Sequence, residues 1–167
     1  MHSERTDNAK INAISPKISH MSARDSCHFA VKSALIKAGW IITADPYRII
    51  YQDIDLYADL AAEKPISAER AGRKIIVEIK SFTGRSSITD LHGAVGQYII
   101  YRQFIQLTDP GYELYLAIDD EIYENFFSRE SITTLLNAQQ IKLLVVDLSK
   151  EEIQQWIEPT PSNTIDN

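Results

Sequence analysis

Residues 75–81, Ile75-Ile76-Val77-Glu78-Ile79-Lys80-Ser81, decide how we interpret the fold. The run is apolar, rich in β-branched residues and too short for a helix, so it predicts a core strand. Alternate side chains share a face of a strand, so Glu78 and Lys80 point to one face and their apolar neighbours to the other. A carboxylate and an ammonium on one buried face are costly unless they pair or bind a ligand. The stretch therefore predicts a core strand with a polar site on it.

Asp59 lies upstream on a second apolar segment, Asp53–Leu60. Apolar and polar residues alternate along this segment, which predicts another strand. If the two strands pair, Asp59 comes to lie beside Glu78. Two carboxylates and a lysine that meet at a strand end can hold a hydrated Mg²⁺. The sequence therefore favours a divalent-cation site at Asp59, Glu78 and Lys80.

Length and composition are those of one globular domain. The chain has 167 residues, of which 44% are hydrophobic and 24% are charged, and this length can bury a core of ordinary size. The single cysteine, Cys27, excludes an internal disulfide and fits a reducing cytoplasm. No segment approaches the roughly 18 apolar residues of a membrane span, and the first residues lack a signal-peptide pattern. We expect a cytoplasmic protein that does not enter a membrane.

The boundaries of the domain follow from polarity. Residues 1–20 are polar and aperiodic, so we interpret them as a flexible N-terminal extension that could precede a natural start at Met21. Residues 159–167 are a polar tail, which we also expect to be flexible. Residues 21–158 are left as a single domain.

Charge is distributed unevenly along the chain, whose net charge is −6. Residues 64–85 carry a local charge of +4 around the candidate site, and residues 109–158 carry a local charge of −8. The net charge argues against a broad nucleic-acid footprint, whereas the positive segment would suit a phosphate backbone. A solvated loop on an acidic protein explains the positive segment equally well.

Two helices carry further candidate residues. Ser22-x-x-Asp25 and Ser87-x-x-Asp90 are capping-box patterns, and they predict helices to about Ala38 and Leu107. His28 and Lys32 share a face of the first helix, and Gln97 and Tyr101 share a face of the second. His28 could be a site residue or an ordinary hydrogen-bonding histidine. Gln97 could bind a ligand or satisfy the backbone of a neighbouring strand.

The remaining periodicity completes the fold. We expect strands at 40–43 and 47–51 to form a first hairpin region around an Asp45-Pro46 turn. We also expect strands at 112–118 and 141–147, and short helices at 121–127, 131–138 and 149–157. This order predicts an α/β (α+β) fold with a mixed central sheet flanked by helices. It is also the order of a restriction-endonuclease-like core.

The candidate residues resemble a known nuclease signature. Asp59 followed by Glu78-Ile79-Lys80 is similar to the D…(D/E)-x-K pattern of the restriction-endonuclease-like superfamily, PD-(D/E)XK. Gln97 and Tyr101 supply a Q-x-x-x-Y pair downstream, and a histidine lies upstream. This order of motifs resembles the RecB-type branch of that superfamily.

Residues 21 to about 147 resemble a narrower family, the fdxN-element excision controlling factors or XisH-like proteins. The resemblance is carried by Ser22–Asp25, His28–Lys32, Lys37–Trp40 with Asp45-Pro46, Tyr57–Lys64, Ile76–Phe82, and Leu91–Tyr98 with Tyr101-Arg102. The family name implies a role in the programmed removal of a DNA element. It also implies a site-specific recombinase and a small XisI-like protein as partners.

Two functions are compatible with these resemblances. In the first, the protein is a nuclease in which Asp59, Glu78 and the Ile79 carbonyl hold Mg²⁺ or Mn²⁺, and Lys80 orients or deprotonates a water. His28, Gln97 and Tyr101 would then position phosphate or DNA. In the second, the protein keeps the fold without catalysis and binds an XisI-like partner or the recombinase. A homo-oligomer is compatible with either function.

Overall fold

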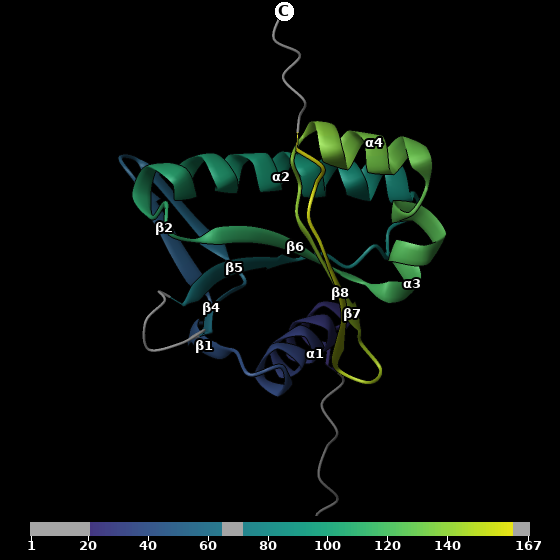
Figure 1. The fold of residues 1–167 in the computed structure, drawn as a ribbon, viewed down its shortest axis with the longest axis horizontal. Coiled ribbons are helices and arrows are strands. Elements are labelled where there is room, and N and C mark those ends of the chain that lie inside the picture. The colour runs from purple at the N-terminus through teal and green to yellow at the C-terminus, as the bar shows by residue number, and fades with distance from the viewer. Residues whose placement is uncertain (1–20, 65–71, 162–167) are drawn as a thin grey trace, which may run out of the picture.

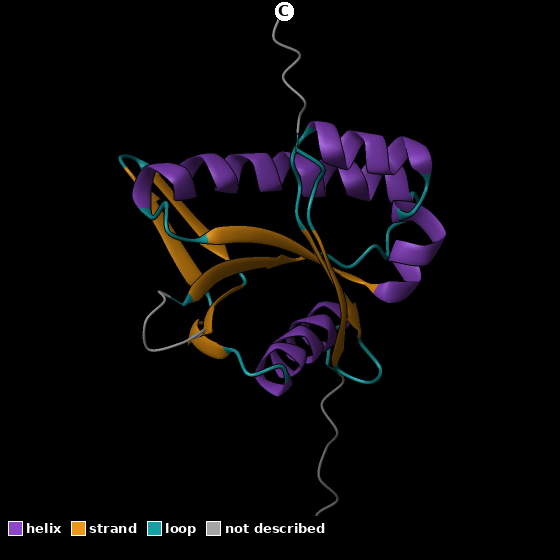
Figure 2. Cartoon of the chain, in the orientation of Figure 1, coloured by secondary structure: helices purple, strands orange, loops and turns teal. Residues whose placement is uncertain are grey.

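A six-stranded mixed sheet forms the middle layer of the molecule, with helices on both of its faces (Figure 1). The computed structural model describes residues 21–64 and 72–161. The extension expected at residues 1–20 and most of the expected C-terminal tail lie outside these ranges. One long helix and its short neighbours cover one face, and the first helix covers the other (Figure 2). The expected mixed α/β fold is confirmed, and it is consistent with a restriction-endonuclease-like core.

The elements carry the labels of Figure 1. In chain order they are α1 (Ala23–Lys37), β1 (Ile41–Ala44), β2 (Tyr47–Tyr51), β3 (Ile54–Ala58), β4 (Leu60–Lys64), β5 (Arg73–Ile79), α2 (Ser87–Thr108), β6 (Glu113–Asp119), α3 (Asp120–Ile122), the π-helical turn η1 (Tyr123–Phe127), α4 (Glu130–Ala138), β7 (Leu143–Asp147) and β8 (Glu152–Ile157). None of the helices in the described ranges is long and apolar enough to cross a membrane.

The sheet has the strand order β1-β4-β5-β6-β7-β8. The central strands β5, β6 and β7 run parallel, and β4 and β8 pair antiparallel with this unit. β2 and β3 form a separate antiparallel hairpin. The hairpin expected between residues 40–43 and 47–51 is wrong, because β1 pairs with β4 in the main sheet while β2 pairs with β3. α2 is the crossover that connects β5 to its parallel neighbour β6, so it must lie across the sheet. The C-terminal end of β5 therefore opens beside the start of α2.

β5 separates two hydrophobic cores because its side chains alternate between the faces of the sheet. Ile76 packs in the core under α2 and α4, whereas Ile75 and Val77 pack in the core under α1. Glu78 lies on the same face of β5 as Ile76. The alternation expected from the sequence is thus confirmed, and it directs the Glu78 carboxylate toward α2.

Local chemistry sets both ends of α1. Ser22 Oγ accepts a hydrogen bond from the Asp25 N–H at 3.1 Å, so the serine caps the helix. It also donates one to the Asp25 carboxylate, which thus binds the serine hydroxyl where a capping box would bind the serine N–H. Gly39 follows the helix with a φ of +87°, a conformation that glycine adopts without steric cost. The first expected helix is confirmed.

The segment Asp53–Leu60 forms two strands rather than the single strand that we expected. The chain bends at Asp59, so that β3 pairs with β2 while β4 joins the main sheet. The alternation of apolar residues continues through the bend and gives no sign of it. Extending the β4–β5 register by one step from the Leu60–Val77 pair places Asp59 opposite Glu78.

The final helix expected at residues 149–157 is wrong, because this segment contains strand β8, which pairs with β7. Asp147 Oδ1 accepts hydrogen bonds from the hydroxyl of Ser149 and from two main-chain N–H groups of the following turn. The serine therefore stabilises a turn instead of capping a helix. The turn returns the chain along β7 and brings Trp156 against Trp40, with ring centroids 5.5 Å apart.

Tyr98 ties α2 to the sheet and gives a test of the fold. Its hydroxyl donates a hydrogen bond to the Leu114 carbonyl at 2.8 Å and accepts one from the Lys142 N–H at 3.1 Å. Since this site is buried, we expect Tyr98→Phe to lower the free energy of unfolding by about 1–3 kcal/mol, as measured by urea unfolding. Tyr112→Phe is the control, because its hydroxyl makes a long 3.4 Å contact with Glu63. Equal losses in the two variants would contradict this expectation.

Candidate active site

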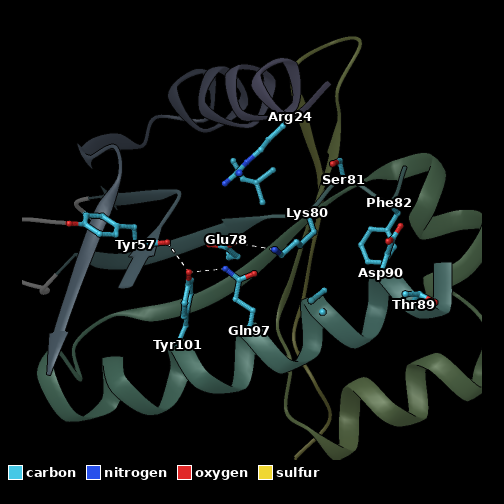
Figure 3. A pocket seen from close by; sticks show the side chains of 13 residues that line it. Arg24, Tyr57, Glu78, Lys80, Ser81, Phe82, Thr89, Asp90, Gln97 and Tyr101 are labelled. Atoms are coloured by element: carbon cyan, nitrogen blue, oxygen red, sulfur yellow. Dashed lines mark hydrogen bonds and ion pairs between the residues drawn. The ribbon is translucent and has the colours of Figure 1, made fainter. Parts of the chain in front are cut away.

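A cavity of about 540 Å³ opens at the C-terminal end of β5, between α1 and α2 (Figure 3). β5 and the residue after it, α2 and α1 supply polar groups that include Glu78, Lys80, Gln97, Tyr101 and Arg24. The cavity is also lined by Tyr57, Ser81, Thr89 and Asp90. The main chain of the residue between Glu78 and Lys80 also lines it. The cavity therefore collects most of the residues that the sequence marks as candidates.

Glu78 has the most unusual environment in the cavity. The residue is only 3% exposed, and its Oε2 atom has no hydrogen-bond partner within the described ranges. Burial and then the charge of Asp59 raise the pKa of Glu78 to about 7. Lys80 Nζ lies 3.6 Å from Glu78 Oε1, and its charge lowers this pKa without offsetting the rise. A buried carboxylate in this state binds a proton near pH 7 or a cation above it.

Asp59 lies at the bend between β3 and β4 and borders a narrower cleft beside the cavity. Its Oδ2 accepts a hydrogen bond from the Ile79 N–H at 2.7 Å. Its Oδ1 lies 3.8 Å from His28 Nδ1 and 4.0 Å from an Arg24 guanidinium nitrogen. The cleft and the cavity share Arg24, Ile79 and Ser81. Asp59 therefore approaches the candidate site from the α1 side, whereas Glu78 approaches it from the α2 side.

Gln97 and Tyr101 form a connected pair on α2. Gln97 Nε2 donates a hydrogen bond to the Tyr101 hydroxyl at 2.7 Å, and that hydroxyl donates to the Tyr57 carbonyl at 2.8 Å (Figure 3). Burial is the main cause of a raised pKa at Tyr101, with the charge of Glu78 adding to it. The pair thus satisfies the backbone of β3 and lines the cavity at the same time. The Gln97 amide thus bonds the Tyr101 side chain, and it is Tyr101 that bonds the strand backbone which one interpretation assigned to Gln97.

His28 and two residues that the sequence did not mark lie on or beside α1. His28 Nε2 lies 2.8 Å from Asp45 Oδ1, and Lys32 donates to the other oxygen of the same carboxylate. We interpreted Asp45 only as part of a turn with the following proline. Arg24 is a further residue that the sequence analysis missed, and its side chain is 84% exposed above the cavity. Arg24 lies one helical turn before His28, so the two side chains share a face of α1, and this spacing could have marked Arg24 as a site residue.

The basic segment at residues 64–85 does not surround the site as expected. Arg73 and Lys74 begin β5 and pair with acidic residues there, whereas Lys80 follows its other end. A strand rises about 3.3 Å per residue, so the two ends are roughly 20 Å apart. Lys64 donates to a main-chain carbonyl after α1, and Arg70 lies outside the described residues. Of the described cations of this segment, Lys80 alone lines the cavity.

The donor set fits a hydrated Mg²⁺ better than a metal that needs a full protein cage. Among residues 21–64 and 72–161, no cluster of three or more His, Cys, Asp and Glu side chains could hold a metal ion. Mg²⁺ usually keeps several waters and needs one or two carboxylates. Glu78 supplies a carboxylate of the required kind at the wall of the cavity. The residues present are therefore compatible with the expected cation.

Comparison with known proteins adds the family. The model of the XisH protein family matches residues 21–154. The chain belongs to the XisH family. No curated protein matches the chain. The resemblance drawn from the sequence is therefore confirmed at the level of the family, with residues 1–20 outside the matched region.

Two solved structures are similar to this one along most of the chain. An XisH family protein from Nostoc punctiforme has a TM-score of 0.74 and 38% sequence identity, covering 80% of this chain and 100% of that chain. An fdxN element excision controlling factor protein from Anabaena variabilis has a TM-score of 0.73 and 40% identity, covering 81% of this chain and 100% of that chain. The fold described here is therefore shared with both proteins.

The raised pKa of Glu78 predicts a pH dependence of stability. Between the ordinary glutamate pKa, about 4.5, and about 7, the folded state holds a proton that the unfolded state has lost, so stability falls as pH rises. We expect Glu78→Gln to remove this slope, and to gain about 2–3 kcal/mol over wild type between pH 5 and pH 8 without divalent cations. Urea unfolding at the two pH values measures the gain.

Glu63→Gln is the matched control for this prediction. Glu63 lies on the neighbouring strand β4, is exposed to solvent on its side chain and pairs with Lys74 outside the cavity. Its substitution should leave the pH slope of wild type in place. Parallel stability curves for wild type and Glu78→Gln would contradict the buried, ionisable role of Glu78.

Proposed function

We propose that this XisH family protein is a Mg²⁺-dependent DNA endonuclease that acts in programmed DNA rearrangement. One observation carries the proposal: the Glu78 carboxylate is buried at the wall of a solvent-accessible cavity, and one of its oxygens has no partner among the described residues. The adjoining lysine and the order of motifs around it support hydrolysis of a phosphodiester. The name of the similar Anabaena variabilis protein supports the part that concerns excision of a DNA element.

The residues at the end of β5 would hold the cation and the reacting phosphate. Glu78, Asp59 and the carbonyl of Ile79 would bind Mg²⁺ or Mn²⁺. Such a cation, when bound, lowers the pKa of a water and offsets charge on the phosphate. Lys80 follows β5 directly and donates its N–H groups to the attacking water and to phosphate oxygens that gain charge.

Residues from both helices would position the DNA. Tyr101 is fixed by the Tyr57 carbonyl, and Gln97 is fixed by Tyr101, so both present polar groups in a set orientation. Arg24 lies across the cavity from this pair (Figure 3), and its exposed guanidinium suits a backbone phosphate. His28 supports the site from the adjoining cleft. DNA would thus be held between α1 and α2.

The charge of the chain favours a small DNA footprint. The net charge is −6, and the cations at the start of β5 are paired with acidic residues. Each phosphate contact to a basic residue contributes to affinity and to its salt dependence. Binding would therefore depend on the cavity and its cation more than on a broad basic surface.

A non-catalytic accessory role is the second candidate function. In this role the protein regulates a site-specific recombinase by binding it or a small XisI-like protein. Two observations favour it: Asp59 already uses one oxygen on the Ile79 N–H, and residues 109–158 carry a charge of −8, which suits protein contacts better than DNA. Self-association is compatible with this role as well.

Cleavage of single-stranded, duplex and branched DNA with and without Mg²⁺ or Mn²⁺ tests the nuclease. We expect cation-dependent cleavage by wild type, and a loss of about 100-fold or more in rate for Glu78→Ala and for Lys80→Ala, because each removes a group that meets the reacting phosphate or its cation. Product analysis on denaturing gels gives the rates.

Glu63→Ala and Lys74→Ala are matched controls for these variants. They remove another Glu–Lys ion pair, 3.6 Å long, which joins β4 to β5 outside the cavity, and they should cleave as wild type does. Equal activity in all variants would indicate a contaminating nuclease and defeat the proposal. No cleavage of any substrate by wild type would favour the accessory role.

A further inference from the structure

The β2–β3 hairpin has one buried face and one exposed face. Ile49 and Ala58 belong to the core under α2, and Tyr51 packs against Phe104 with ring centroids 5.7 Å apart. Alternate residues of a strand point to opposite faces, so Tyr57, directly before Ala58, points away from this core. Tyr57 is 51% exposed. A large aromatic side chain thus lies on the outer face of the hairpin.

Tyr57 connects this outer face to the cavity. The residue lines the cavity, and its main-chain carbonyl accepts the hydrogen bond from the Tyr101 hydroxyl. Its ring extends from there in the direction away from Gln97 (Figure 3). The outer face of the hairpin is therefore continuous with the cavity wall that carries Tyr101 and Gln97.

Arg48 holds the ring of Tyr57 from the neighbouring strand. The two residues are cross-strand partners, and the Arg48 guanidinium lies 5.8 Å from the centroid of the ring. Both carboxylate oxygens of Asp55 accept hydrogen bonds from this guanidinium, at 2.9 and 2.7 Å, which fixes its orientation. An exposed ring that is already held in place loses little conformational entropy when a ligand stacks on it.

The charge of the chain makes stacking an effective way to hold DNA at this face. The net charge is −6, and the Arg48 guanidinium is already paired with Asp55, so charge attracts phosphate groups only weakly here. Stacking of a base on an aromatic ring adds affinity without a phosphate contact, and it accepts any base. It requires a base that is not stacked within a duplex.

We propose that Tyr57 is a stacking platform for an unpaired nucleobase of the DNA that the cavity binds. The proposal rests on the proposed function in placing DNA between α1 and α2, and it does not require that this DNA is cleaved. It names the substrate class as single-stranded or branched DNA, in contrast to continuous duplex. The competing role is structural, in which Tyr57 and Arg48 stabilise the hairpin as a cross-strand pair and bind no ligand.

Binding of the full chain to a fluorescein-labelled thymidine strand of about 15 nucleotides, and to a blunt duplex, tests the proposal by fluorescence anisotropy. The measurements are made in EDTA, where a cation-dependent nuclease is inactive, and again with Ca²⁺, which also binds carboxylate oxygens. We expect Tyr57→Ala to weaken single-strand binding about tenfold or more, because the stacking ring is lost. Duplex binding should stay within about twofold of wild type, because paired bases cannot stack on the ring.

Three further variants separate stacking from a structural role. Tyr57→Phe keeps the ring and should bind the single strand within about twofold of wild type, whereas Tyr57→Leu keeps an apolar side chain without the ring and should lose binding as Tyr57→Ala does. Ile50→Ala is the matched control, since Ile50 is 53% exposed on the same outer face but has no ring. It should bind as wild type does.

Salt dependence separates stacking from a charge contact. The loss caused by Tyr57→Ala should be equal at low and high salt, because stacking does not release counterions. The loss caused by Arg24→Ala should shrink as salt rises, because that guanidinium contacts a phosphate.

Several results would overturn the stacking platform. These are unchanged single-strand binding in Tyr57→Ala, equal losses for single strand and duplex, wild-type binding by Tyr57→Leu, or no single-strand binding by wild type in either buffer. Single-strand binding that depends on Tyr57 in a protein that cleaves no DNA would support the platform and reject the nuclease. Cation-dependent cleavage by a protein whose single-strand binding is independent of Tyr57 would support the nuclease and reject the platform.

Discussion

The hydrogen bond from the Ile79 N–H to Asp59 Oδ2 joins two strands at the point where each one changes course. At Asp59 the chain leaves the β2–β3 hairpin and enters the main sheet, and at Ile79 the strand β5 ends. The bond fixes the bend of one strand against the end of the other. Tyr57 lies two residues before Asp59, and Lys80 directly follows Ile79. Both residues line the cavity, so the shape of its walls depends on this hydrogen bond.

The junction also makes the two carboxylates unequal. Asp59 accepts a hydrogen bond from a main-chain N–H and faces His28 and Arg24 on the α1 side. Glu78, in contrast, is buried under α2, and one of its oxygens has no partner in the part of the chain that the structure describes. The charge of Asp59 adds to the effect of burial in raising the pKa of Glu78. Pairs of acidic groups whose environments differ in this way are typical of sites that handle protons or cations.

The sequence predicted the features that depend on local periodicity. Local spacing was enough to predict the β5 strand, the face of Glu78 and the helices that carry His28 and Gln97. A strand places every second residue on one face, and a helix places residues about four apart on one face. Ser87-x-x-Asp90 was a weaker guide: α2 begins at Ser87, but Asp90 accepts a hydrogen bond from the Gly84 N–H instead of capping the helix.

Features that depend on distant partners were not predictable from these patterns. The bend at Asp59 is set by Ile79, 20 residues away in the chain, and nothing in the local alternation encodes it. Strand β8 has only six residues, too few for a period to distinguish helix from strand, and its pairing with β7 decided the outcome. The contact of Asp45 with His28, 17 positions earlier, depends on how the chain folds, so a turn signal was all that the sequence offered.

The loss of folding stability caused by burying the Glu78 carboxylate distinguishes the two candidate functions. Burying an ionised carboxylate lowers stability when one of its oxygens is left without a partner, as Oε2 of Glu78 is among the described residues. An apolar side chain at the same position of β5 would extend the core under α2. A protein that works only as a scaffold gains nothing from this carboxylate in a cavity. A divalent cation, in contrast, would supply the missing partner and offset the loss when bound. Departures from local stability rules concentrate at functional sites, and this one lies beside Lys80 and between two helices that present Arg24 and Gln97. The buried oxygen of Glu78 is therefore the strongest physical reason to favour a cation-dependent activity over a purely structural role.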